Sequence, residues 1–262
     1  MSDMIDIRHL RLDLDDHVIL DDVSMTVERG QRWSVVGPNG AGKSSLLKCL
    51  VRIHQSYKGR ISVDGLDARG YSNRELARLV AYVPQAGGRL PPFTVRETIL
   101  MSRYPHLSHF GTMGRHDYDL VRDLLARTGI GALAERSMAT LSGGERQKVF
   151  LAAALAQEAP VLLLDEPTAF LDPRHSHDIR NLLYKLNKED EVTVIEVTHD
   201  LNAAVLDSDR IFALREGRTA FFGPPDKFLD EDVLKRLYDR SFLLGEHPVT
   251  GQPMILPGRC GE

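Results

Sequence analysis

The sequence predicts an α/β fold: a mainly parallel sheet covered by helices, together with an antiparallel β subdomain and an inserted helical subdomain. In the second half, apolar segments that fit buried strands, Val161–Leu164 and Val192–Val197, alternate with helical patterns, one of which starts near Gly143. Near the N-terminus, residues 10–15 and 23–27 instead alternate between apolar and polar side chains. That alternation is typical of half-buried antiparallel strands.

The middle of the chain predicts the helical subdomain. Apolar residues recur with helical spacing over Asp117–Thr128, and glycine and proline residues punctuate both ends of the region. Further along, Glu216-Gly217 predicts the turn of a late hairpin. We therefore predict a nucleotide-binding core with the antiparallel β subdomain (residues 1–86 and 142–224), a helical subdomain (87–141) and a C-terminal helical tail (225–262).

Composition excludes several classes of protein. The 262 residues carry 33 basic and 37 acidic side chains, a net charge of −4, which argues against binding nucleic acid through its phosphates. Cys49 and Cys260 have neither metal-ligand nor disulfide spacing. No secretory signal is evident, and no apolar run approaches the roughly 20 residues that cross a bilayer. We therefore expect a soluble, intracellular protein.

A glycine-rich segment follows the expected strand Trp33–Val36 and precedes an expected helix that starts at Lys43. It fits the pattern of a phosphate-binding loop, a glycine and four residues before Gly-Lys-Ser. Glycines allow backbone N–H groups and the helix N-terminus to converge on an anion. The predicted phosphate-binding residues are Gly37, Pro38, Asn39, Gly40, Ala41, Gly42, Lys43, Ser44 and Ser45.

Two side chains distinguish this loop from a glycine-rich turn that binds nothing. Lys43 has the position that reaches the terminal phosphates, and Ser44 has the position whose hydroxyl holds Mg²⁺. The sequence therefore predicts a site for a nucleoside triphosphate and Mg²⁺.

Two acidic residues, Asp165 and Glu166, come directly after the buried strand Val161–Leu164. The carboxyl ends of strands in an open α/β sheet are where ligands bind. Asp165 is suited to hold Mg²⁺ through water, and Glu166 to polarise the attacking water and accept its proton. Alone, such a pair is as often an ordinary exit from a strand; beside a phosphate loop, catalysis is the stronger interpretation.

Two further residues follow strands of the same predicted sheet. His199, after Val192–Val197, is placed to donate to the γ-phosphate or to orient the water. Gln85, after the expected strand Val80–Val83, is placed to bridge the metal and the attacking water. Each alone is more often a structural histidine or a surface amide. With the neighbouring motifs, we predict Glu166, His199 and Gln85 as catalytic, and Ser44, Gln85 and Asp165 as metal-binding.

Leu141–Glu145, with the sequence LSGGE, resembles the signature motif of ATP-binding cassette (ABC) proteins, in which glutamine is usual at the last position. The phosphate loop, Gln85, this motif, Asp165-Glu166, Asp172 and His199 occur in the order of that family. The resemblance extends from about Ile7 to Leu256. It implies that ATP is the nucleotide.

The signature also has a physical interpretation. Ser142, Gly143 and Gly144 at a helix start form a second anion-binding site. The resemblance implies a head-to-tail homodimer in which these three residues contact the ATP that the other chain's phosphate loop holds. In the family, Asp172 crosses the same interface.

One position departs from the family's pattern. Members of the family usually stack an aromatic residue on adenine from a position that falls near Leu14 here, and the nearest ring is that of His17. The missing stacking contact weakens ATP binding by about 1–3 kcal/mol, by analogy with stacking of bases on aromatic residues.

Three shorter segments, which are less specific than the motifs above, resemble one group of the family. Thr94–Thr98, Ser102–His106 and His247–Pro253 resemble segments of the ATPases of iron-chelate importers. That resemblance implies import of a ferric siderophore, haem or cobalamin, with a separate membrane permease, a secreted or periplasmic substrate-binding protein and a location on the inner face of the cell membrane. The alternatives are another cargo, a soluble ABC ATPase of cluster assembly or DNA metabolism, and a scaffold that binds ATP without hydrolysing it.

Overall fold

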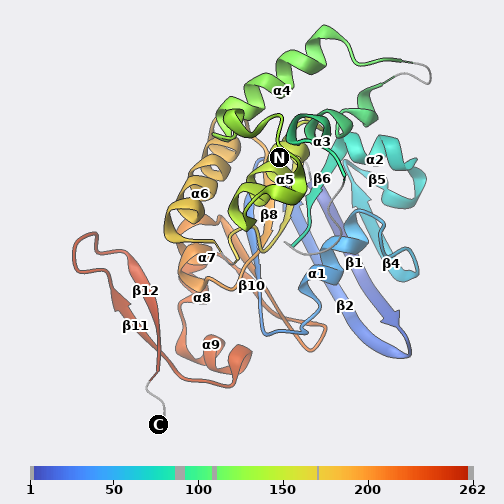
Figure 1. Cartoon of the computed structure of the whole chain (residues 1–262). Coiled ribbons are helices and arrows are strands. Elements are labelled where there is room, and N and C mark those ends of the chain that lie inside the picture. The colour runs from blue at the N-terminus through green and yellow to red at the C-terminus, as the bar shows by residue number, and fades with distance from the viewer. Residues whose placement is uncertain (1–2, 86–91, 108–110, 170, 259–262) are drawn as a thin grey trace. The chain divides into compact units, whose positions relative to one another are not determined.

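A computed structural model of the chain (Figure 1) describes residues 3–85, 92–107, 111–169 and 171–258. Its contacts divide the chain into two compact units. Unit 1 comprises Met1–Ala68 and Thr193–Glu262, and unit 2 comprises Arg69–Val192. Cys260 and the glycines at 87 and 88 lie outside the described residues.

Unit 1 contains an antiparallel sheet of β1 (Asp3–Leu14), β2 (His17–Glu28), β4 (Tyr57–Val63) and β5 (Leu66–Asp67), in the order β2-β1-β4-β5. The long strands β1 and β2 are drawn in blue in Figure 1. Alternate apolar residues such as Leu10 and Leu12 are fully buried. The predicted alternating strands are therefore confirmed.

Unit 1 also contains a group of parallel strands. β3 (Arg32–Val36) lies between β8 (Thr193–Val197) and β9 (Arg210–Arg215), parallel to both. Every residue of β3 and β8 is buried, as expected for strands covered on both faces. β10 (Arg218–Gly223) returns antiparallel to β9 through Glu216 and Gly217, which both have positive φ. The late hairpin is therefore confirmed.

The helices of unit 1 are α1 (Lys43–Leu50), α7 (Leu201–Asp207), α8 (Pro225–Phe228) and α9 (Glu231–Tyr238). The tail then differs from the helical prediction. After α9 the chain forms an antiparallel hairpin of β11 (Phe242–Glu246) and β12 (Pro253–Pro257). Pro248, Gly251 and Pro253 disfavour a helix there, and Gly251 has a φ of +66°.

Unit 2 contains two parallel strands, β6 (Val80–Val83) and β7 (Val161–Asp165), both predicted. Its helices include α2 (Asn73–Leu79), α5 (Gly143–Leu155) and α6 (Pro173–Lys188). A 3₁₀ turn, η1 (Ala68–Gly70), lies where the sequence passes from unit 1 to unit 2. The chain thus contains parallel strands, helices and a separate antiparallel sheet, which confirms the predicted mixed α/β class.

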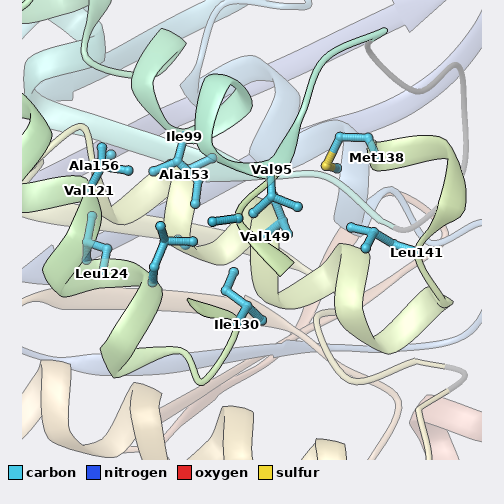
Figure 2. Close-up of a cluster of buried hydrophobic side chains, with 13 residues drawn as sticks. Val95, Ile99, Val121, Leu124, Ile130, Met138, Leu141, Val149, Ala153 and Ala156 are labelled. Atoms are coloured by element: carbon cyan, nitrogen blue, oxygen red, sulfur yellow. The ribbon is translucent and has the colours of Figure 1, made fainter. Parts of the chain in front are cut away.

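The middle of unit 2 is helical, as predicted, with α3 (Val95–Met101), α4 (Arg115–Arg127) and the 3₁₀ turns η2 (Tyr104–His106), η3 (Gly131–Leu133) and η4 (Met138–Thr140). Figure 2 shows Val95 and Ile99 of α3 and Val121 and Leu124 of α4 beside Val149 of α5 in one buried apolar cluster. The cluster packs these helices around the second half of α5.

The buried side chain of Arg103 also stabilises this helical region. Arg103 donates to the Asp117 carboxylate over 2.8 Å and to the Ala156 carbonyl and Glu158 carboxylate over 2.6 Å each. Its side chain is only 3% exposed. Buried charges are stable when they are paired in this way.

Among the described residues, no helix has both the length and the apolar character that a membrane-spanning segment needs.

Candidate functional site

The predicted phosphate loop joins β3 to α1 in unit 1, the expected strand–loop–helix arrangement. Two of its glycines are required by their surroundings. A Cβ on Gly37 would lie 2.1 Å from the Leu214 carbonyl oxygen, and one on Gly42 would lie 2.8 Å from the Ile19 carbonyl oxygen. Gly42 has a φ of +96° and caps α1 without a side-chain hydrogen bond. The first N–H groups of α1 therefore follow a loop in which positions 37 and 42 have no room for a side chain, a geometry that fits a phosphate group.

Lys43 lies over this loop. Its ammonium donates to the Gly37 carbonyl over 2.8 Å and to the Pro38 carbonyl over 2.9 Å. The residue is only 6% exposed, so its charge is held at the loop. Ser44, the next residue, is half-buried in the first turn of α1. An ammonium, a hydroxyl and backbone N–H groups form a donor set that suits a triphosphate with its metal ion.

His199 follows β8, the strand beside β3. Val35 and Val197 are register partners, and the Thr198 N–H donates to the Val35 carbonyl over 3.2 Å. Because β3 and β8 are parallel, His199 and the phosphate loop start from the same edge of the sheet. His199 is exposed there.

Asp165 is the last residue of β7 in unit 2 and is 2% exposed. The hydroxyl of Tyr82, on the neighbouring strand β6, donates to its Oδ2 over 3.2 Å. Burial, and then the charge of Asp165, raise the pKa of Tyr82, which therefore keeps the proton that it donates. The sequence interpretation missed Tyr82. Its one available signal was a polar hydroxyl inside the expected strand Val80–Val83, three residues before Gln85.

Glu166 follows Asp165 in a left-handed conformation with φ of 52°. Its Oε2 accepts a hydrogen bond of 2.7 Å from Nε2 of Gln85, which follows the parallel strand β6. Left-handed backbone costs a non-glycine residue on the order of 1–3 kcal/mol, and such strain is common at active sites. The structure thus brings together two predicted catalytic side chains that lie far apart in the sequence.

The predicted signature residues start α5. Ser142 caps this helix: its Oγ accepts from the Glu145 N–H over 3.3 Å, and Glu145 Oε2 accepts from the Ser142 N–H over 2.7 Å. The Ser142 N–H is the main cause of a lowered pKa at Glu145, so this carboxylate stays ionised. Glutamate at this position completes a reciprocal capping box. Gly143 and Gly144 form the first turn.

Asp172 caps α6 in the same unit, accepting from the His175 N–H over 3.0 Å. His175 also donates from its ring, and no role was predicted for it from the sequence.

The predicted residues are divided between the units. The phosphate loop and His199 belong to unit 1, whereas Gln85, Asp165, Glu166, the signature residues and Asp172 belong to unit 2. At the family's aromatic position, Leu14 is half-buried and pairs with exposed His17 across a turn formed by Asp15 and Asp16.

Comparisons with known proteins extend this picture. The family described as ABC transporter matches residues 20–169. The ferric enterobactin transport ATP-binding protein of Escherichia coli is 35% identical over 241 residues, which cover 92% of this chain and 89% of that protein. The hemin import ATP-binding protein of Streptomyces coelicolor is 39% identical over 250 residues, which cover 95% and 88% of the two chains.

Two solved structures are similar over most of the chain. One, from an inward-facing transporter described as being of the metal-chelate type, has a TM-score of 0.85 at 26% identity and covers 98% of each chain. Another, a dimeric ATP-binding cassette with ADP and phosphate bound, has a TM-score of 0.74 at 28% identity and covers 85% of this chain and 99% of that one. The resemblance inferred from the ordered motifs is therefore confirmed. With more than half of its residues matched by the family and similarity to ATP-binding import subunits along nearly its whole length, the chain belongs to the ABC transporter family and is an ATPase of that family.

Proposed function

We propose that this ATPase powers the import of a metal chelate, such as a ferric siderophore, haem or cobalamin, through a separate membrane permease. The observation that carries the proposal is similarity along nearly the whole chain to ATP-binding proteins named for ferric enterobactin and hemin import. The similar solved transporter of the metal-chelate type supports it further. The permease and a substrate-binding protein are the partners that this function requires, and the inner face of the cell membrane is the location.

The residues of the phosphate loop, Gly37 to Ser45, bind the phosphates of ATP in this proposal. Two glycines that exclude any side chain and an ammonium held at the loop support the assignment. Ser44, Gln85 and, through water, Asp165 would hold Mg²⁺, which prefers oxygen ligands. Mg²⁺, when bound, neutralises phosphate charge.

Hydrolysis depends on Glu166, which orients the attacking water and accepts its proton. The hydrogen bond from Gln85 supports this role, because it fixes the direction of the carboxylate. Tyr82 orients Asp165 in the same way. His199, exposed at the sheet edge from which the phosphate loop starts, contacts the γ-phosphate.

The active form in this proposal is a homodimer. Ser142, Gly143 and Gly144 of one copy contact the ATP held by the phosphate loop of the other, and Asp172 crosses the interface. A capped helix start with two glycines supports a second anion site, and the similar dimeric cassette supports the assembly. Loss of the γ-phosphate removes the charge that holds the copies together. We also keep as a proposal the division into core, helical subdomain 87–141 and tail.

Transport of labelled cargo tests the function. We expect that deleting the gene in its source organism abolishes uptake of one class among radiolabelled ferric siderophore, haem and cobalamin. The wild-type gene restores that uptake, and the Glu166→Gln variant does not. Unchanged uptake of all three would contradict the proposed cargo, and a purified protein that copurifies with no multi-span membrane protein would favour a soluble ABC ATPase.

A further inference from the structure

The start of α6 holds an unusual pair, Asp172 and His175. Asp172 Oδ1 accepts from the His175 N–H over 3.0 Å, and Oδ2 lies 2.6 Å from the ring Nδ1 of the same residue. Both oxygens of the carboxylate are therefore held by one residue. A helix cap of the ordinary kind uses only the first of these two contacts.

The direction of the ring contact follows from the chemistry of the carboxylate. Contacts from His175, first its N–H and then its ring, lower the pKa of Asp172, so the carboxylate is ionised and only accepts hydrogen bonds. Nδ1 of His175 must therefore carry the proton and donate it. Two donors at fixed positions leave the plane of this carboxylate little freedom to rotate.

The same ring lies against the signature motif. A Cβ on Gly144 would lie 3.3 Å from Cγ and 3.5 Å from Nδ1 of His175. The ring therefore occupies the space beside the first turn of α5 while its Nδ1 holds Asp172. Asp172, His175 and Gly144 all belong to unit 2, so this contact is internal to one compact part of the chain.

We propose that His175 is a positioning residue, which fixes the Asp172 carboxylate relative to the start of α5 so that both reach the second copy in one arrangement. The inference rests on the proposed homodimer, because Asp172 and Gly144 have a shared task only there. Asp172 is 56% exposed at its side chain, so without the ring it would adopt several rotamers. Ordering it beforehand removes an entropic cost from dimer closure.

Three substitutions in a Glu166→Gln background, which accumulates the ATP-bound dimer in the proposed function, test this role. H175N keeps a side-chain donor near the position of Nδ1. H175F keeps a ring beside Gly144 but has no donor. H177A is the matched control, because His177 lies on the same exposed helix turn and its Nε2 contacts Asn181 instead. The measured quantity is the ATP concentration that gives half-maximal dimer with Mg²⁺, by light scattering.

We expect H175F to raise that concentration about three- to tenfold, the usual effect of losing one net-stabilising hydrogen bond. H175N and H177A should stay within about twofold of the parent. Binding of a fluorescent ATP analogue to the monomer should be the same in all variants, since His175 acts only toward the second copy in this proposal.

The outcomes separate the inference from the function on which it rests. A parent Glu166→Gln protein that stays monomeric with saturating MgATP would overturn the proposed dimer and this inference with it. A dimerising parent with H175F indistinguishable from H177A would overturn the role of His175 alone, as would H175N impaired as strongly as H175F. If H175F does not fold, H175A takes its place and has the same expected direction.

Discussion

Gln85 and Glu166 are joined by a hydrogen bond of 2.7 Å, donated by Nε2 and accepted by Oε2. The two residues follow the neighbouring parallel strands β6 and β7, so the sheet itself sets their separation. A carboxylate aimed by an amide is suited to act as a base on a water molecule.

Glu166→Gln should reduce ATP turnover roughly 10²–10⁴-fold, the usual contribution of a positioned base. ATP binding should persist, because the phosphate loop is unchanged. Phosphate release under saturating MgATP measures the effect. Glu189→Gln, at an exposed helix end, is a control that keeps wild-type turnover. Unchanged hydrolysis by the Glu166 variant would refute its role.

Lys43→Ala should weaken nucleotide binding about 10- to 100-fold, as expected for losing a hydrogen bond to a charged group. The ammonium is held at the loop by the carbonyls of Gly37 and Pro38, and no other lysine belongs to this loop. Titration with a fluorescent ATP analogue measures affinity. Lys48→Ala, on the same helix, should bind normally. Equal affinity in both variants would count against the phosphate site.

Ser142→Arg should abolish the MgATP-dependent dimer while leaving nucleotide binding by the monomer intact. The substitution places a long cation where α5 presents its first N–H groups and removes the Oγ that accepts from Glu145. Size-exclusion chromatography in the Glu166→Gln background reports the dimer. A variant that still dimerises would show that this helix start lies away from the interface.

Leu14→Tyr should tighten ATP binding by about 1 kcal/mol, roughly the lower bound for stacking of a base on an aromatic ring. Leu14 is half-buried beside a turn where the family usually has an aromatic residue. Calorimetric titration of the purified protein measures the change. Leu66→Tyr, at an exposed strand position, is the matched control. Equal affinities for both variants would place adenine elsewhere.

Arg103→Ala should lower the free energy of unfolding by about 3 kcal/mol, the scale of leaving a buried ion pair without one partner. It removes the donor to Asp117, Glu158 and the Ala156 carbonyl together. Urea denaturation at neutral pH measures the loss. Arg122→Ala, on the exposed side of α4, should be nearly neutral.

The ion pair between Arg103 and Asp117 predicts that the free energy of unfolding depends on pH. The hydrogen bond from Arg103, and then the Gly114 N–H, hold the pKa of Asp117 below its ordinary value. A depressed pKa in the folded state stabilises the protein above the unfolded value of about 3.9, and this contribution disappears as pH falls below it. The stability gap between wild type and Asp117→Asn should therefore shrink between about pH 5 and the acid limit of folding. A constant gap would refute this coupling.

Much of the fold and of the candidate site could be predicted because the informative residues follow strands. Glu166 and Gln85 each come shortly after an apolar segment, and the parallel strands β6 and β7 bring these positions to a common edge. His199 likewise follows β8, which is parallel to the strand that leads into the phosphate loop. The loop from Gly37 to Ser45 is a contiguous pattern, so its strand and helix could be placed around it.

Other features depend on side-chain directions that a sequence does not reveal. Tyr82 reaches Asp165 only because β6 and β7 pair in the observed register. His175 packs against Gly144, and the two residues lie far apart in the sequence. The hairpin β11–β12 was missed for a different reason: the helical pattern of α9 was extended past prolines and a glycine that break it.

At Glu166, the requirements of stability and of ATP turnover conflict, because the catalytic carboxylate is carried by a residue with left-handed backbone. Glycine tolerates that conformation without strain, so a chain selected for thermal robustness alone would gain by discarding the carboxylate. Selection for thermal stability alone should therefore favour variants that have lost ATPase activity. Selection that also requires ATP hydrolysis in each round should retain Glu166.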